Sequence, residues 1–261
     1  MRLRAIVAYD GTAYQGWQSQ RGRAPTLQEE IERALSVALR EPIRIRAAGR
    51  TDTGVHALGQ VIAFDVSGDP YPADAAADAS GASSLDALLR SVNALLPPDV
   101  AVRSLAGARA EFDPRRDAVR RAYRYRIWNA PVRSPFEGRI AWHVREPLDV
   151  RAMQSAAAAV VGEHDFASFQ GADHVARASI RHVFASGVER AGDVVTYRVE
   201  ANAFARHMVR NLVGELVEIG RGRRGPESIA ALLAARDRRL AAAPAPPHGL
   251  VLEWVRYPEG G

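Results

Sequence analysis

The chain has 261 residues, of which 47% are hydrophobic and 25% are charged, as is ordinary for a soluble globular protein, and its length predicts two compact units. Cysteine is absent, which excludes disulfides, thiolate nucleophiles and Cys-bound metals. No apolar run approaches the ~20 residues that a membrane span needs, and the first residues lack the apolar core of a signal peptide. We therefore expect a cytoplasmic enzyme that makes no contact with a membrane.

The basic side chains are all arginine, 35 in number, against 30 acidic side chains, so the net charge is +5. The absence of lysine excludes Schiff-base chemistry and the lysine of a phosphate-binding P-loop. An excess of positive charge suits an acidic partner such as nucleic acid. A genomic preference for arginine and alanine codons explains part of this bias, so net charge alone gives RNA binding limited support.

The N-terminal half is predicted to follow the order β-α-β-β-α-β, which is that of a ferredoxin-like unit. The expected strands are 2–9, 43–47, 60–66 and 100–105. A capping box at Thr26–Glu29 opens the first helix. A leucine-rich stripe over 85–95 predicts the second helix, which Pro97 and Pro98 end.

The C-terminal half repeats this order. Its expected strands are 119–128, 180–189, 194–201 and 250–256, and its expected helices are 149–161, 203–220 and 226–235. The predicted class is α+β, with two ferredoxin-like, RRM-like βαββαβ units, 1–108 and 109–261. We expect them to join into a mainly antiparallel sheet with helices on one side and a central RNA-binding cleft. Segments 67–82 and 236–247 are expected to be mobile loops.

The segment Ala48-Gly49-Arg50-Thr51-Asp52-Thr53-Gly54-Val55-His56 is the leading candidate for a functional site. It lies between two expected strands and contains one carboxylate, Asp52, close to one guanidinium, Arg50. Its glycines allow a positive φ or a close approach of the backbone to a ligand. The alternative is a tight turn in which Arg50 and Asp52 form a surface ion pair.

Asp52 has three functional interpretations. Asp-Thr-Gly is the motif of aspartic proteases, but those enzymes need two carboxylates, no second such motif exists, and a homodimeric protease would be far shorter. A glycosidase needs a second acid within about 5–10 Å, and none can be identified from the sequence. A single aspartate can act as a nucleophile when a nearby arginine, which lowers its pKa by about 1–3 units, keeps it ionised.

The third interpretation agrees with a family resemblance that covers nearly the whole chain. Six segments, in the right order, resemble the motifs of the A-type tRNA pseudouridine synthases. These segments are Tyr9–Gln18, Ala48–Ala57 with Gly59-Gln60, Phe112–Arg115 with Arg121–Tyr125, His164–Phe169, Phe204–Asn211, and Pro246–Tyr257. Pro114 departs from the family pattern, where alanine is common, which puts the local loop geometry in doubt.

The resemblance implies a role for each matching residue. Asp52 falls on the catalytic aspartate, and Arg210 falls on the basic residue that pairs with it. Tyr123 falls on the aromatic residue that stacks on the target base, although a half-buried strand would show the same pattern. Arg50 falls on the arginine that enters the space left by the flipped base. The further RNA-binding residues that we expect are His56, Gln60, Arg206 and His207.

Elementary energetics agree with these roles. Extruding a uridine from a stem costs a few kcal/mol, and stacking on an aromatic ring returns roughly 1–3 kcal/mol. Arg210 lies on a predominantly apolar predicted helix, where an unpaired guanidinium would be costly. A carboxylate partner is therefore expected for it.

The reaction implied by the resemblance is the isomerisation of uridine to pseudouridine at positions 38, 39 and 40 of the tRNA anticodon stem-loop. It requires no cofactor, and the histidines show no metal-binding spacing, so we expect no metal. The sequence leaves open whether Asp52 attacks C1′, attacks C6 or removes the 2′ proton. The expected partners are tRNA and a second copy of the chain in a homodimer.

Two alternatives remain open at this point. A non-catalytic RNA-binding or chaperone protein could be built on two RRM-like units, although the RNP1 pattern of such modules is absent. Within the chain, the cluster Arg221-Gly222-Arg223-Arg224 could bind phosphates or could simply end a helix, where glycine and cations are favoured.

Overall fold

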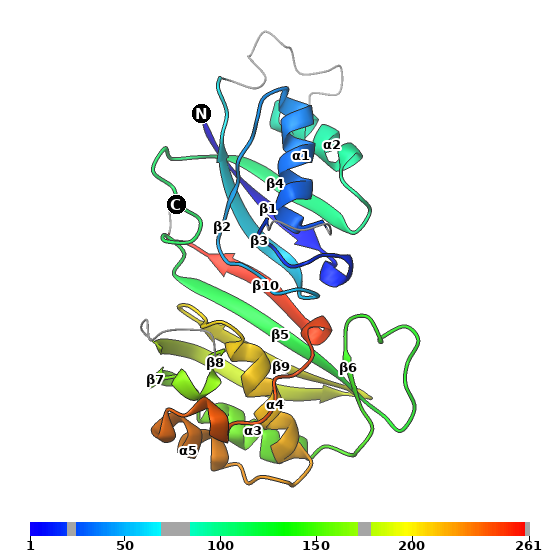
Figure 1. Ribbon diagram of the computed structural model, residues 1–261, viewed down its shortest axis with the longest axis vertical. Coiled ribbons are helices and arrows are strands. Elements are labelled where there is room, and N and C mark those ends of the chain that lie inside the picture. The colour runs from blue at the N-terminus through cyan, green and yellow to red at the C-terminus, as the bar shows by residue number, and fades with distance from the viewer. Residues whose placement is uncertain (20–24, 69–83, 172–178, 259–261) are drawn as a thin grey trace. The chain divides into compact units, whose positions relative to one another are not determined.

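The computed structural model describes residues 1–19, 25–68, 84–171 and 179–258 (Figure 1). The chain forms two compact units. Unit 1 comprises Met1–Val119 and Leu252–Gly261, and unit 2 comprises Arg120–Val251. The chain therefore returns to unit 1 at its C-terminal end, whereas the predicted domains, 1–108 and 109–261, are each continuous. The functional roles assigned to those domains, and the cleft between them, stay predictions.

Unit 1 contains the predicted β-α-β-β-α-β order. Its elements are β1 Arg2–Tyr9, α1 Leu27–Leu39, β2 Arg46–Ala47, β3 His56–Asp65, α2 Ser84–Leu95 and β4 Val100–Ala108. Strand β1 lies between β3 and β4 and pairs antiparallel with both. The last strand, β10 (Leu250–Arg256), follows β3 in the sheet. Helices α1 and α2 pack against each other on one face of these strands (Figure 1).

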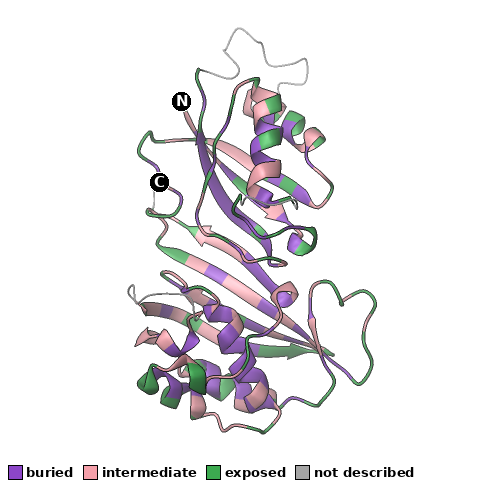
Figure 2. Cartoon of the chain, viewed as in Figure 1, coloured by how far each residue is buried: buried purple, intermediate pink, exposed green. Residues whose placement is uncertain are grey.

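Helix α1 begins where its sequence predicts. The Thr26 side chain accepts a hydrogen bond from the Glu29 backbone, and the Glu29 carboxylate accepts one from the Thr26 backbone at 3.2 Å. This reciprocal cap satisfies two amide groups that the first helical turn would otherwise leave unpaired. The apolar face of α1 is fully buried at Leu27, Ile31 and Leu35 (Figure 2).

Unit 2 is also an α+β unit with mainly antiparallel pairing. Its strands are β5 Arg120–Asn129, β6 Trp142–Val144, β7 Gly162–Asp165, β8 Ile180–Ala191 and β9 Val194–Ala201. Their order is β5-β9-β8-β7, with β6 parallel to the end of β5. The helices are α3 Val150–Ala158, α4 Met208–Gly220 and α5 Ser228–Ala235, and α3 packs along β8 and against α4.

The predicted fold class is confirmed, and several boundaries differ. Strand β2 is shorter than predicted because only Arg46 and Ala47 pair with β3, although Ile43 and Ile45 are buried. Helix α4 begins at Met208 instead of 203, because His207 adopts a left-handed φ of 61° that a right-handed helix cannot contain. Strands β6 and β7 were not predicted, because three or four residues are too few to show an alternating pattern.

No helix in the described parts of the chain has both the length and the apolar character needed to cross a membrane. Helix α4, most of whose residues are buried, lies against other parts of unit 2. Its residue Glu215 is completely buried, and the carboxylate accepts hydrogen bonds from Arg224, Ser228 and the Ala242 backbone at 2.9–3.0 Å. A buried carboxylate is tolerated only when it is paired in this way.

The segment 236–247, predicted to be a mobile loop, lies across α4. Ala245 is completely buried, and its backbone N–H donates to the Arg210 carbonyl at 3.0 Å. A Cβ atom at Gly214 would lie 2.0 Å from the Ala243 carbonyl oxygen, so the helix and this segment meet backbone to backbone. The other predicted loop, 67–82, falls largely outside the described residues.

We predict that Gly214→Ala destabilises the protein by about 1–3 kcal/mol, because the added methyl group forces α4 away from Ala243. Helix propensity alone predicts the opposite, a gain of about 1 kcal/mol. Thermal unfolding followed by circular dichroism measures the effect. Gly107→Ala on β4 is the control, because its Cβ would meet nothing within 4 Å. An unchanged or raised midpoint for Gly214→Ala would contradict the close packing.

Candidate active-site loop and RNA-contact residues

The loop that contains Asp52 joins β2 to β3 in unit 1. The Val55 backbone N–H donates to the Asp52 carbonyl at 3.1 Å, and Gly54 takes the positive φ of 77° that this turn needs. Thr51 is buried, with 6% of its surface exposed, whereas Asp52 is partly exposed. The turn therefore keeps the carboxylate accessible while its neighbour anchors the backbone.

The N-terminal segment Gly11–Trp17 supports this loop through backbone contacts. A Cβ atom at Gly11 would lie 2.0 Å from the Val55 carbonyl oxygen, and one at Gly16 would lie 3.0 Å from the Thr51 carbonyl oxygen. Gly16 also has a positive φ of 79°. The Trp17 backbone N–H donates to the Thr51 carbonyl at 3.0 Å. A side chain has no room at Gly11, and at Gly16 the close contact and the positive φ both favour glycine.

Two of the predicted RNA-binding residues lie beneath the loop. Gln60 is completely buried, and its amide nitrogen donates to the Gly49 carbonyl at 2.7 Å. His56 is 4% exposed, and its Nδ1 accepts a hydrogen bond from the Gly11 backbone at 3.0 Å. This geometry fits residues that hold the loop in place. The contact with RNA predicted for them stays a prediction.

The surroundings of His56 favour two different protonation states. Accepting from Gly11 requires an unprotonated Nδ1, whereas Asp10 Oδ1, 3.1 Å from the same atom, suits a protonated one. The hydrogen bond from Gly11 requires a lone pair on Nδ1. The backbone donor is fixed, and Asp10 Oδ1 already accepts two hydrogen bonds from Thr12.

Arg50 is exposed, and it lies two residues from Asp52 in the same loop. The structure thus brings Asp52, Arg50, His56 and Gln60 together in unit 1. It also adds two residues whose contacts the sequence did not reveal, Tyr9 and Trp17. Both belong to the N-terminal motif Tyr9–Gln18, so the motif was visible in the sequence, but its contact with the loop was not.

The remaining predicted site residues belong to unit 2. Tyr123 lies on β5 opposite Val199 of β9 and is partly exposed. Its ring packs edge to face against Phe204, with the ring centroids 5.0 Å apart and the planes at 86°. This contact fixes the orientation of the tyrosine ring, as a stacking surface requires.

Arg210 is partly buried on α4, and its Nε donates to the Ala245 carbonyl at 2.8 Å. Its charge lies near Tyr125, a completely buried residue whose hydroxyl donates to the Pro246 carbonyl at 2.7 Å. Burial raises the pKa of Tyr125 well above its ordinary value, and the positive charge of Arg210 opposes this only in part. Tyr125 is therefore a neutral hydrogen-bond donor.

Arg206 and His207 precede α4. Arg206 is exposed, and its carbonyl accepts a hydrogen bond from the Gly171 backbone at 2.9 Å. The His207 ring lies so close to Gly171 that a Cβ there would meet Nδ1 at 2.9 Å. A left-handed φ on a non-glycine residue is uncommon and persists only where surrounding contacts enforce it. These contacts fix the direction of the segment that presents Arg206.

The basic cluster at the end of α4 is paired with acidic residues. Arg221 and Arg223 form ion pairs with Glu218, at 2.8 and 3.3 Å, and Arg224 pairs with the buried Glu215 at 2.9 Å. Of the two interpretations left open by the sequence, this geometry favours a helix terminus.

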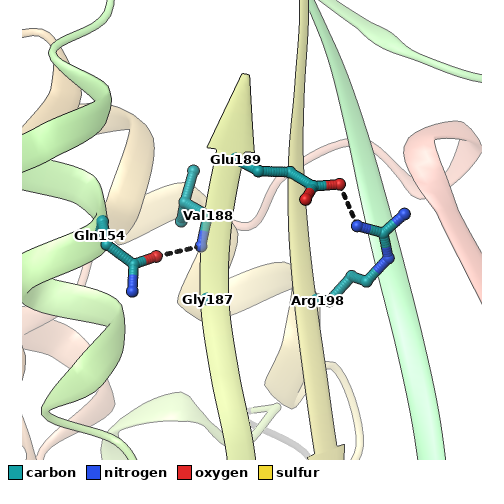
Figure 3. Close-up of a pocket in the computed structure, with 5 residues that line it drawn as sticks. All are labelled: Gln154, Gly187, Val188, Glu189 and Arg198. Carbon is teal, nitrogen blue, oxygen red and sulfur yellow. Dashed lines mark hydrogen bonds and ion pairs between the residues drawn. The ribbon is translucent and has the colours of Figure 1, made fainter. Parts of the chain in front are cut away.

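A cavity of about 260 Å³ in unit 2 is lined by Gln154, Gly187, Val188, Glu189 and Arg198 (Figure 3). Gln154 accepts a hydrogen bond from the Val188 backbone, and Glu189 forms an ion pair with Arg198. Because these polar groups satisfy one another, the cavity resembles a gap between α3 and the sheet more than a site of reaction.

Comparison with known proteins supports the resemblance read from the sequence. The family model described as tRNA pseudouridine synthase matches residues 5–113 and 156–258. A tRNA pseudouridine synthase A from Myxococcus xanthus is 43% identical over 99% of this chain and 93% of its own length. That from Paraburkholderia phytofirmans is 45% identical over 99% of this chain and 90% of its own.

A further relative of the same name, from Geotalea uraniireducens, is 41% identical over 98% of this chain and 99% of its own length. A crystal structure of a Cbf5–Nop10–Gar1 complex matches 82% of this chain and 45% of its own chain, at 12% identity and a TM-score of 0.36. The sequence matches, which extend over both units, carry the assignment. The chain belongs to the tRNA pseudouridine synthase family, a family of isomerases.

Proposed function

We propose that this tRNA pseudouridine synthase acts on uridines 38, 39 and 40 of the anticodon stem-loop, with Asp52 as its nucleophile. The observation that carries the proposal is the geometry of the Asp52 loop. Its one carboxylate is partly exposed on a turn whose backbone is fixed by the N-terminal segment. A nucleophile must be held in position before the reaction, whereas the residues of a surface ion pair need no such fixed backbone.

The proposed reaction balances without a further reactant. The N1–C1′ bond of uridine breaks, the base turns while it is held, and a C5–C1′ bond forms. The hydrogen on C5 is lost, and N1 gains one. Asp52 is regenerated on each route: its bond to C1′ or C6 breaks again as the product forms, or the 2′ proton that it removed is returned.

The remaining site residues act on the RNA in this proposal. Arg50, exposed beside Asp52, fills the space from which the uridine is extruded. Tyr123, whose ring Phe204 holds, stacks on the extruded base. Arg210 has the role of the basic residue that pairs with the catalytic aspartate, as the family resemblance implies.

The family resemblance also supports a homodimer, in which one subunit holds the tRNA body while the other reacts, and a cytoplasmic location. The alternative, a non-catalytic RNA-binding or chaperone protein, has no use for an accessible carboxylate on a rigid turn. Identity above 40% to proteins named as synthases, over nearly the full chain, argues against that alternative.

We predict that Asp52→Asn lowers the rate of pseudouridine formation by roughly 10⁴-fold or more, because the amide cannot act as a nucleophile. The affinity for tRNA should stay within several-fold of the original protein. Unmodified tRNA is incubated with each protein without cofactor, and pseudouridine is mapped in the product. Asp193→Asn is the matched control, because Asp193 is an exposed acid in the turn between β8 and β9.

Each outcome of this experiment is informative. Product from Asp52→Asn would remove Asp52 as the nucleophile. Tight binding without product from any of the proteins would favour the non-catalytic alternative. Product outside positions 38, 39 and 40 would leave the reaction intact and refute the proposed substrate site.

We predict that Arg50→Ala slows modification of a uridine paired in the stem, because nothing then fills the vacated stack. The defect should shrink when the target uridine is mismatched, since an unpaired base costs less to extrude. Single-turnover rates on matched and mismatched stem-loops measure both effects. Arg33→Ala, an exposed arginine on α1 that pairs with Glu30, is the control. Equal defects on the two substrates would rule out a role in base flipping.

We predict that Arg206→Ala weakens tRNA binding and reduces the slope of log affinity against log salt concentration by about 1, as the loss of one phosphate contact requires. Arg223→Ala should leave the slope unchanged, because Arg223 is neutralised by Glu218 and Glu146. Filter binding over a range of salt concentrations gives both slopes. If the salt dependence of tRNA binding fell more in Arg223→Ala than in Arg206→Ala, the phosphate contact would belong to Arg223 and not to Arg206.

A further inference from the structure

The hydroxyl groups of Tyr9 and Thr51 form a buried hydrogen bond beneath the Asp52 loop. Their oxygen atoms are 2.9 Å apart, and the two residues are 4% and 6% exposed. Thr51 is the residue immediately before Asp52. A rigid contact at Thr51 therefore acts on the peptide from which the catalytic carboxylate projects.

The geometry of the sheet aims Tyr9 at this loop. Tyr9 is the last residue of β1, where Val7 pairs with Gln60 but Tyr9 pairs with Ala57. Strand β3 thus carries one residue more than β1 over this interval, which is a β-bulge. Bulges redirect side chains and occur often beside active sites.

Gln60 connects this pair of hydroxyl groups to the backbone of the loop. Its amide nitrogen donates to the Gly49 carbonyl at 2.7 Å and lies 3.5 Å from the Tyr9 hydroxyl. An amide nitrogen can only donate, so the Tyr9 oxygen is the acceptor in its contact with Gln60, while either hydroxyl can be the donor between Tyr9 and Thr51. Reversing the Gln60 amide would place its oxygen against the Gly49 carbonyl, two acceptors facing each other.

Thr51 is consequently held on two sides. Its side chain is bound to Tyr9, and its carbonyl accepts from the Trp17 backbone at 3.0 Å. Together these contacts restrain rotation of the backbone that leads into Asp52. Removing one hydroxyl would loosen this restraint while leaving the Tyr9 ring against Trp17, where the ring centroids are 5.9 Å apart.

We propose that Tyr9 and Thr51 are positioning residues that set the orientation of the Asp52 carboxylate through their shared hydrogen bond. The proposal rests on the proposed function, in which Asp52 is the nucleophile. Neither residue touches the substrate in this scheme. A displacement of a reacting group by about 1 Å can cost about 100-fold in rate, so a loop held less firmly lowers the rate of the chemical step.

The decisive variant is Tyr9→Phe, which removes only the hydroxyl. The single-turnover rate at saturating tRNA should fall by about 10- to 100-fold. The dissociation constant for tRNA should stay within twofold, because no RNA contact is lost. Tyr14→Phe is the matched control: Tyr14 is 5% exposed in the same segment, but its hydroxyl donates to Asp99 at 2.7 Å. Its single-turnover rate should be that of the original protein.

Thr51 supplies a second, independent test. Thr51→Val should slow the single-turnover rate as Tyr9→Phe does, and Thr51→Ser, which keeps the hydroxyl, should restore most of it. If both residues act through one hydrogen bond, the double variant Tyr9→Phe/Thr51→Val is no slower than the slower single variant. Independent effects would instead multiply.

Three results would overturn the proposal. The first is an unchanged single-turnover rate for Tyr9→Phe, and the second is a double variant whose defect is the product of the two single defects. The third is that Tyr9→Phe and Tyr14→Phe lose the same amount of activity, in proportion to the fall in their unfolding temperatures. The last result would mean that the hydroxyl serves only stability. If Asp52→Asn is active, the proposed function with Asp52 as nucleophile is refuted. If Asp52→Asn is inactive but Tyr9→Phe is fully active, only the positioning role of Tyr9 is refuted.

Discussion

The proposed active-site loop depends on the close approach of two backbone segments in unit 1. Gly11 and Gly16 bring the N-terminal segment against the loop, where any Cβ would lie 2.0–3.0 Å from a carbonyl oxygen. This contact allows the Trp17 backbone to bind Thr51 and the Gly11 backbone to bind His56. The backbone from which the Asp52 side chain projects is therefore held by fixed backbone groups. Fixed dipoles of this kind need no rearrangement when the reaction begins.

The same arrangement separates residues that support the site from residues that can meet RNA. Gln60, His56 and Thr51 are buried and hydrogen-bonded, whereas Arg50 and Arg206 are exposed. The Gln60 amide nitrogen, the His56 Nδ1 and the Thr51 hydroxyl already bind protein groups, so these atoms are poor partners for an incoming ligand. Sequence motifs contain both kinds of residue, which is why a motif alone does not tell a supporting side chain from one that contacts the substrate.

Local signals explain what the sequence could predict. The capping box of Thr26 and Glu29 and the long alternating strands each depend on residues close together in the chain, and the structure contains them. The start of α4 was misplaced because the left-handed conformation of His207 depends on its packing against Gly171, which is distant in sequence. The contact of Tyr9 with Thr51 and the pairing of Arg224 with Glu215 are likewise non-local. Periodicity cannot report such contacts.

The structure shows that many of the arginines are paired with carboxylates, so their number overstates the positive charge available to RNA. Arg44 pairs with the buried Glu32, Arg126 with Glu137, and Arg224 with Glu215. Each of these guanidinium groups already has a carboxylate partner, so it adds little to the field that an RNA phosphate experiences. In the proposed function the attraction of tRNA comes from exposed arginines such as Arg50, whose side chain has no hydrogen bond or ion pair within the described residues. The net charge of +5 is therefore a weaker guide to RNA binding than the positions of those few arginines.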